Sequence, residues 1–248
     1  MSRWPVAVIL AGGLGTRFGD RRPKQLLEIG GRTILEHSVA AFEAASGVAE
    51  ILLVMAPGFT AEAERIVHAG GYRKVRAVIA GGSSRSDSTR KALAALGAAG
   101  AGSADGKAIR GVLFHDAARP LVDARIIADC VRALEDFAGV TTAMPATDTV
   151  LAVEGGLVTD IPDRARLYCC QTPQAFRLDT IVRAHQLAAA AAAEDDFEAT
   201  DDCGVVRRYL PDVPIAVVRG SERNLKITTR GDLALASALL AAPSENRL

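Results

Sequence analysis

Features that would assign the chain to several common classes are scarce or missing. Aromatic residues make up only 4% of its 248 residues, and its four cysteines (Cys130, Cys169, Cys170 and Cys203) show no CxxC spacing. Zinc-ribbon and thioredoxin-type sites are therefore not indicated. The adjacent Cys169 and Cys170 cannot readily bridge each other. We therefore expect reduced thiols and a cytoplasmic protein.

The chain also lacks a net charge and a long apolar run. It has 29 Lys plus Arg and 29 Asp plus Glu, so no overall field favours nucleic acid or an anionic membrane. No window approaches the ~18 consecutive apolar residues of a membrane span. The apolar run near the N-terminus is cut short by Gly12, Gly13 and Arg17, so it resembles a first strand more than a signal peptide. We expect neither nucleic acid nor membrane as a partner, and any bound anion must be held by a local site.

Runs rich in β-branched residues alternate with helical patterns along most of the chain. The expected strands are Val6–Leu10, Ile51–Ala56, Val75–Ile79, Gly111–His115 and Val140–Pro145, and the clearest helical patterns are Thr33–Ala45, Ser86–Leu96 and Ile126–Phe137. This alternation predicts an α/β, Rossmann-like fold with a mainly parallel sheet and helices on both faces. We expect one domain over residues 1–248, because this length suits a single α/β unit.

One segment departs from this rhythm. Two short alternating stretches, Thr149–Val153 and Leu157–Ile161, flank Glu154-Gly155-Gly156, which is a hairpin signal. The sequence therefore predicts an inserted β-hairpin arm at about residues 147–167, a kind of insertion suited to covering a site or reaching a partner.

A glycine-rich turn follows the first expected strand, and cations follow the turn. Glycines let backbone N–H groups approach a phosphate, and Arg17 and Lys24 would neutralise charge on a triphosphate. A dinucleotide-binding loop of an NAD(P) oxidoreductase is the alternative. Phe18 occupies its third glycine position, however, and the second expected strand ends in Ala56-Pro57 without an acidic residue for a ribose. That alternative is therefore less favoured.

Segments that combine glycines with charged or polar residues occur in a fixed order along the chain. They are Leu10-Ala-Gly-Gly-x-Gly-x-Arg17, Pro23-Lys24-Gln25, Gly81-Gly82-x-x-Arg85-x-x-Ser88, His115-Asp116-Ala-Ala-Arg119-Pro120, Asp148-Thr149, Gln171-Thr172-Pro173-Gln174 and Asn224-Leu-Lys226-Ile-Thr228. In this order they resemble the CTP-dependent alditol-phosphate cytidylyltransferases, from Val6 to about Leu240. The family contains 2-C-methyl-D-erythritol 4-phosphate and ribitol-5-phosphate cytidylyltransferases.

The resemblance implies a role for each matching residue. Catalytic roles fall on Arg17, Lys24 and Lys226, and nucleotide binding falls on Ala11, Gly12, Gly13, Gly15, Gly82, Arg85 and Ser88. Binding of the alditol phosphate falls on Asp116, Thr149, Arg164 and Thr172, and Lys226 is expected on the last strand. The resemblance also implies a homodimer whose arms are exchanged between subunits.

Some of these residues admit other interpretations. Asp116 at a strand end suits Mg²⁺, which takes oxygen ligands and bridges protein to triphosphate, but it could instead be a helix N-cap. Ser88 could be a helix-capping residue. His115 is better explained as a hydrogen-bonded core histidine than as a base.

The sequence motifs do not decide between the two branches of the family. Leu10-Ala-Gly-Gly, Val150-Leu151 after Asp148-Thr149, Tyr168 and Cys203 look more like the ribitol-phosphate branch. Ile34-Leu-Glu-His-Ser38, Thr200-Asp-Asp202 and the length suit the isoprenoid branch, which we place first. A non-catalytic nucleotide-binding protein is a further alternative, and the joint presence of Arg17, Lys24, Asp116, Arg164 and Lys226 speaks against it.

Overall fold

The central feature of the computed structural model is a seven-stranded sheet. The structure describes residues 5–13, 22–98, 110–191, 197 and 199–242. The strand order is β11-β7-β10-β6-β1-β4-β5. These strands are β1 (Val6–Ala11), β4 (Glu50–Met55), β5 (Val75–Ala80), β6 (Gly111–Asp116), β7 (Gly139–Pro145), β10 (Tyr168–Arg177) and β11 (Ile215–Arg219). The β10 strand runs antiparallel to β6 and β7, and the other neighbours are parallel.

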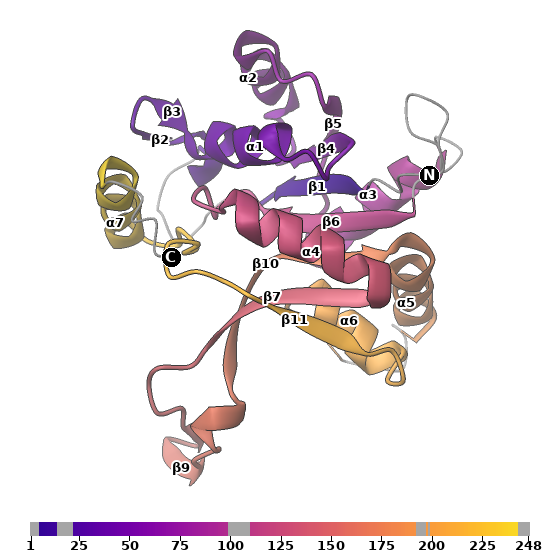
Figure 1. Cartoon of the computed structure of the whole chain (residues 1–248), viewed down its shortest axis with the longest axis vertical. Coiled ribbons are helices and arrows are strands. Elements are labelled where there is room, and N and C mark those ends of the chain that lie inside the picture. The colour runs from indigo at the N-terminus through magenta and orange to yellow at the C-terminus, as the bar shows by residue number, and fades with distance from the viewer. Residues whose placement is uncertain (1–4, 14–21, 99–109, 192–196, 198, 243–248) are drawn as a thin grey trace.

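Helices cover both faces of this sheet (Figure 1). On one face lie α1 (Ile34–Ala44), α2 (Thr60–Gly70) and α4 (Ala124–Asp136), and on the other α3 (Arg85–Ala98), α5 (Leu178–Ala191) and α6 (Asp202–Tyr209). Successive side chains of a strand point to opposite faces. In β1, Ala7 and Ile9 accordingly pack with the first group, and Val6 and Val8 pack with the second. Near-continuous apolar strands result, as expected for a sheet buried on both sides.

A smaller unit packs at one end of the sheet. It consists of the short helix η2 (Lys24–Leu26), the two-stranded ladder β2 (Glu28–Ile29) and β3 (Arg32–Thr33), and α7 (Arg230–Ala241). Ile29, Ile34, Ile227 and Ala236 form its buried apolar cluster. This cluster fixes both the segment around Lys24 and the segment that precedes α7.

The arm extends away from the sheet (Figure 1). It contains β8 (Ala152–Glu154), β9 (Leu157–Asp160) and the short helix η3 (Arg164–Arg166). Gly155 and Gly156 make its turn with φ of 57° and 82°, which is a conformation that favours glycine. The predicted hairpin is confirmed, with β8 shorter than expected because the pairing of β8 with β9 begins only at Ala152.

The other sequence predictions of the fold are largely confirmed. All five expected strands and the three expected helices are present, and the described residues contain no helix long and apolar enough to cross a membrane. Lys226 was wrongly expected on the last strand. The pairing of β11 with β7 ends at Arg219, and the chain then turns so that Ile227 N donates to the carbonyl oxygen of Ala118 at 2.8 Å. Lys226 is thereby placed beside the end of β6.

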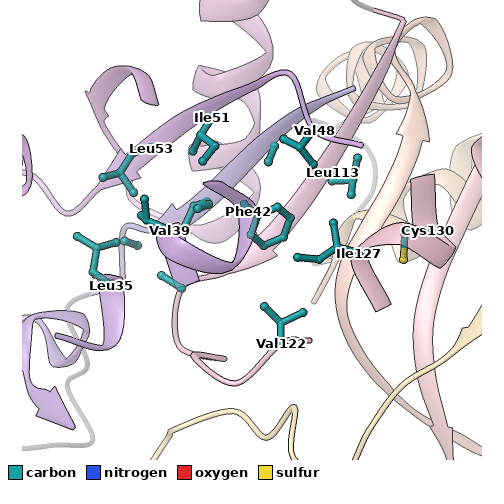
Figure 2. Packing of buried hydrophobic residues seen from close by; sticks show 14 of the residues in the cluster. Leu35, Val39, Phe42, Val48, Ile51, Leu53, Leu113, Val122, Ile127 and Cys130 are labelled. Atoms are coloured by element: carbon teal, nitrogen blue, oxygen red, sulfur yellow. The ribbon is translucent and has the colours of Figure 1, made fainter. Parts of the chain in front are cut away.

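Phe42 of α1 is the largest fully buried side chain of the apolar cluster between the sheet and helices α1, α2 and α4 (Figure 2). It is fully buried, and its ring centroid lies 5.0 Å from that of His115 on β6. We expect Phe42→Ala to lower the free energy of unfolding by about 3–5 kcal/mol, the usual cost of removing a buried aromatic ring. Urea unfolding followed by circular dichroism would measure this change.

The matched control is Val217→Ala on β11, where the side chain is 57% exposed. A surface change of this kind should alter the free energy of unfolding by less than about 0.5 kcal/mol. Equal effects of the two substitutions would contradict the assignment of Phe42 to the core.

Candidate active site

Residues predicted to bind the nucleotide, and Asp116, which is predicted to bind the alditol phosphate and a metal, gather at the carboxyl ends of three parallel strands. Ala11, Gly12 and Gly13 follow or end β1, Gly82 follows β5, and Asp116 ends β6. Ligands of open α/β sheets bind at this edge. Gly15 and Arg17 lie outside the described residues, and their predicted roles stay predictions.

Ser88 joins two of these segments. Its Oγ accepts a hydrogen bond from Gly82 N at 3.0 Å and donates one to the carbonyl oxygen of Ser84 at 2.9 Å. A Cβ on Gly12 would lie 3.0 Å from the same Oγ, so a side chain there would crowd the hydroxyl. Ser88 lies inside α3 rather than at its N-cap position, which makes the capping alternative wrong. The first glycine turn and the Gly81-Gly82 turn therefore meet at one hydroxyl.

Asp116 lies between two cations from distant parts of the chain. Its Oδ2 is 2.7 Å from Lys226 Nζ, and its Oδ1 is 3.5 Å from Arg85 Nε. Burial disfavours the charged carboxylate, but Arg85 and Lys226 outweigh it and hold the pKa of Asp116 well below its ordinary value. The residues after Asp116 form a turn and not a helix, so the N-cap alternative is wrong. The Asp116 carboxylate is therefore favoured in its ionised form and contacts two cations.

Lys24 lies beside Lys226 although about two hundred residues separate them in sequence. Its Nζ donates a hydrogen bond of 2.6 Å to the carbonyl oxygen of Ile227, the residue after Lys226. Lys24 belongs to η2, immediately after the glycine-rich segment. The structure therefore places the Lys24 side chain against the backbone next to Lys226, and the catalytic roles of both residues stay predictions.

Thr172 contacts the end of β6 from β10. Its Oγ1 accepts from Asp116 N at 3.1 Å and lies 3.0 Å from His115 Nδ1. His115 Nε2 lies 3.1 Å from the carbonyl oxygen of Arg119, which can only accept, so Nε2 carries the proton and Nδ1 accepts from the threonine hydroxyl. Burial lowers the pKa of His115 to about 4, against a smaller opposing effect of Asp116. His115 is the neutral, hydrogen-bonded core histidine that the sequence analysis expected.

A buried polar network that the sequence analysis did not assign holds the loop of Lys226. Arg119 donates to the carbonyl oxygens of Asn224 at 2.8 Å and of Cys170 at 3.2 Å. Asn224 Nδ2 in turn donates to Gln171 Oε1 at 3.1 Å and to the carbonyl oxygen of Thr172 at 2.9 Å. Arg119 and Asn224 both lie in motifs that the sequence shares with the cytidylyltransferase family. Their presence in these motifs was the only sequence feature that could have pointed to a role for them. The network fixes the Lys226 loop against β10.

A second unassigned pair lies behind Arg85. Asp202 Oδ2 is 2.7 Å from Arg85 Nη1, and Asp202 Oδ1 is 3.2 Å from His185 Nε2. Asp202 is 1% exposed, and so removed from solvent. Burial alone would lower the pKa of Arg85, but Asp202 and Asp116 raise it above its ordinary value. The result is a continuous row of alternating charges, Lys226, Asp116, Arg85 and Asp202.

The two arm residues predicted to bind the alditol phosphate lie apart from this row. Thr149 and Arg164 are exposed, and Arg164 Nη1 donates to the carbonyl oxygen of Thr147 within the arm. The arm itself points away from the sheet (Figure 1). Within a single chain, these two residues are therefore not brought to Asp116 and Lys226.

The side chains at this edge of the sheet could bind a magnesium ion only together with substrate phosphates. In the described part of the chain, no group of three or more His, Cys, Asp or Glu side chains could hold a metal. Asp116 is one carboxylate, and its two oxygens already face Lys226 and Arg85. Mg²⁺ commonly binds to one or two carboxylates together with substrate phosphates and waters. Asp116 thus suits a metal ion held mainly by the triphosphate.

Comparison with known proteins agrees with this geometry. The family profile described as "IspD: 2-C-methyl-D-erythritol 4-phosphate cytidylyltransferase" matches residues 6–242. The 2-C-methyl-D-erythritol 4-phosphate cytidylyltransferase of Thermobifida fusca is 48% identical over 94% of this chain and 92% of its own length. A bifunctional ribulose 5-phosphate reductase/CDP-ribitol pyrophosphorylase of Haemophilus influenzae is 37% identical over 96% of this chain and 48% of its own length.

A solved structure matches the fold over nearly its whole length. The 4-diphosphocytidyl-2C-methyl-D-erythritol synthase of Anaerococcus prevotii has a TM-score of 0.82 and 27% identity, covering 97% of each chain. The family profile and this solved structure both match the part of the chain that carries the sheet, the arm and the site. The chain belongs to the 2-C-methyl-D-erythritol 4-phosphate cytidylyltransferase family.

Proposed function

We propose that the chain transfers the cytidylyl group of CTP to 2-C-methyl-D-erythritol 4-phosphate, giving 4-CDP-2-C-methyl-D-erythritol and pyrophosphate. The observation that carries the proposal is the 48% identity to a cytidylyltransferase of this name over 92% of that protein's length. The activity belongs to the non-mevalonate isoprenoid pathway. The cations at the sheet edge supply the chemistry that such a transfer needs.

The nucleotide would lie across the glycine segments at the ends of β1 and β5. Gly12 and Gly13 leave backbone groups accessible. Arg85 and Ser88 lie at the start of α3, where Ser88 Oγ accepts a hydrogen bond from Gly82 N. Backbone N–H and C=O groups can distinguish cytosine, which carries an exocyclic amine, from uracil. Gly82 is packed so tightly that an added Cβ would overlap the carboxylate of Asp87, so the turn has no room for a side chain.

The reaction needs positioning and charge neutralisation and no covalent enzyme intermediate. A phosphate oxygen of the alditol phosphate attacks the α-phosphorus of CTP and forms a new P–O bond. The bond from that phosphorus to the bridging β-oxygen breaks, and its electron pair leaves with pyrophosphate. Lys24 and Lys226, together at the sheet edge, would stabilise the negative charge that develops on the phosphoryl oxygens.

We also propose Mg²⁺ as the metal cofactor, with Asp116 as its candidate protein ligand. A divalent cation bound with the triphosphate would offset the charge of the phosphates. Arg85 and Lys226 keep the pKa of Asp116 low despite its burial, so the carboxylate stays charged and is available as an oxygen ligand. Its pairing with Lys226 and Arg85 keeps the carboxylate in one position.

The arm supports a homodimer in the proposal. Large apolar side chains of the arm are exposed, namely Val150, Leu151, Val153, Leu157, Val158 and Ile161. Such a concentration of exposed apolar groups is typical of an interaction surface. Thr149 and Arg164 on the same arm would then reach the site of the partner subunit, where Arg164 could grip the alditol phosphate. A cytoplasmic location completes the proposal, in keeping with four unpaired cysteines.

The substrate is tested by supplying CTP, Mg²⁺ and one alditol phosphate at a time and measuring pyrophosphate release. We expect methylerythritol phosphate to be used at least about tenfold more efficiently than ribitol 5-phosphate, since a polar substrate group left unpaired costs at least this factor. We expect EDTA to abolish turnover. Faster use of ribitol 5-phosphate would favour the CDP-ribitol branch, which the 37% identical relative represents. CTP binding without any product would instead indicate a non-catalytic nucleotide-binding protein.

The role of Lys24 is tested by Lys24→Ala. We expect turnover to fall by roughly two orders of magnitude or more, the scale of removing one electrostatic donor from a transition state. Arg22→Ala is the matched control, because Arg22 is a nearby cation with a half-exposed side chain that pairs with Glu62. Pyrophosphate release under saturating CTP would measure both. Unchanged turnover in a folded Lys24→Ala protein would contradict the catalytic assignment.

The role of the arm is tested by light scattering of the purified protein. We expect a mass of twice the 25.9 kDa of one chain and a shift toward the monomer in the double variant Leu157→Asp/Val158→Asp, because charges would enter an apolar interface. Leu235→Asp on α7, an equally apolar and exposed position, should leave the dimer intact. A wild-type monomer at micromolar concentration would exclude the proposed exchange of arms.

A further inference from the structure

We infer that Asp202 is a positioning residue that holds the Arg85 guanidinium in the nucleotide site, and that His185 supports Asp202 in this role. The inference deepens the proposed function and rests on it. None of the motif roles assigned from the sequence includes Asp202 or His185. What singles them out is the buried geometry behind Arg85.

Asp202 makes the closer of the two carboxylate contacts of Arg85. Arg85 Nη1 is 2.7 Å from Asp202 Oδ2, whereas Arg85 Nε is 3.5 Å from Asp116 Oδ1. Asp116 is also shared, because its other oxygen lies 2.7 Å from Lys226. Hydrogen bonds to charged groups are strongest at short distance. Asp202 is therefore the main anchor of the guanidinium.

Asp202 is itself held from three elements. Its backbone N donates to Oε1 of the fully buried Gln174 on β10 at 3.1 Å, and it begins α6 directly after Asp201, whose Oδ1 accepts from Gly204 N. His185 on α5 lies 3.2 Å from its second carboxylate oxygen. Because the carboxylate is so restrained, it can restrain Arg85 in turn.

One N–H donor group of Arg85 is not used within the described part of the chain. Its Nη2 is buried and has no hydrogen-bond partner within the described part of the chain. A buried, unpaired guanidinium N–H is costly, and such groups occur where a ligand completes the hydrogen bonding. With Nη1 and Nε fixed by two carboxylates, the orientation of Nη2 is fixed as well. The Arg85 side chain, which is 22% exposed as a whole, is thus held in one orientation from which its exposed part can contact a bound nucleotide.

Removing the charge of Asp202 would leave Asp116 as the main carboxylate partner of Arg85, with Asp201 as a weaker one. Asp116 would then be shared between Arg85 and Lys226 without the closest anchor of the guanidinium. A cytidine contact through Arg85 would act on the bound substrate and on the transition state alike, and loss of such uniform binding raises KM without lowering kcat. A residue that only stabilises the fold would lower the amount of active protein without this split.

The test is Asp202→Asn, which keeps the shape of the side chain and removes its charge. We expect KM for CTP to rise about tenfold, the scale of one charge-assisted hydrogen bond, while kcat changes less than about threefold. Asp179→Asn, an exposed acidic residue in the first turn of α5, is the control and should leave both constants unchanged. KM for CTP within about twofold of wild type would overturn the inference.

A double-mutant cycle separates positioning from stability. If Asp202 acts through Arg85, Asp202→Asn should add less than about twofold to KM in an Arg85→Ala background, because coupled residues are not additive. A full additional tenfold increase would overturn the inference. His185→Gln provides a milder variant should Asp202→Asn fold poorly, and it should raise KM for CTP about threefold, since it weakens the anchor without removing it.

The same experiments test the proposed function and the inference about Asp202 independently of each other. Product formation by the wild-type protein with an unchanged Asp202→Asn variant would remove the inference and leave the function intact. Calorimetric titration with CTP alone measures the effect of Asp202→Asn on nucleotide binding even if no alditol phosphate is turned over. A wild-type affinity for CTP in the Asp202→Asn variant would overturn the inference in that case as well.

Discussion

The row of alternating charges at the sheet edge holds the whole site together. Lys226 comes from a loop near the end of the chain, Asp116 from β6, Arg85 from the start of α3 and Asp202 from the start of α6. A buried charge is tolerated only when an opposite charge and good hydrogen bonds compensate its lost hydration. Each carboxylate here lies between two partners, so the four segments can be brought together without an isolated buried charge.

The apolar scaffold determines where this row lies. The β1 and β6 strands are adjacent and parallel, which places the glycine turn and Asp116 at one edge. The β10 strand runs in the opposite direction and inserts Thr172 against the backbone of Asp116. The arm lies just before β10 in the chain, so its root adjoins the site even though its tip extends away. A partner that engages the arm would therefore be linked mechanically to β10.

The loop of Lys226 illustrates how an irregular segment is made rigid. Arg119 donates to the carbonyl oxygen of Asn224 in the loop, and Lys24 donates to that of Ile227. The Asn224 side chain ties the loop to β10 by donating to the carbonyl oxygen of Thr172. The segment has no sheet or helix pairing of its own, so these side chains satisfy its polar groups. Charged side chains on such a loop can therefore be positioned as firmly as on a strand.

The sequence by itself determined five strands of the main sheet, three of the helices, the hairpin turn at Gly155 and Gly156, and the residue types of the site, because apolar periodicity and glycine conformation are local properties. It also indicated the family through ordered motifs. Only the tertiary structure decided that Lys226 leaves the last strand to meet Asp116, that Ser88 joins two turns, and that Asp202 and His185 stand behind Arg85. These contacts join residues up to 117 positions apart, and no local pattern encodes the distance between them.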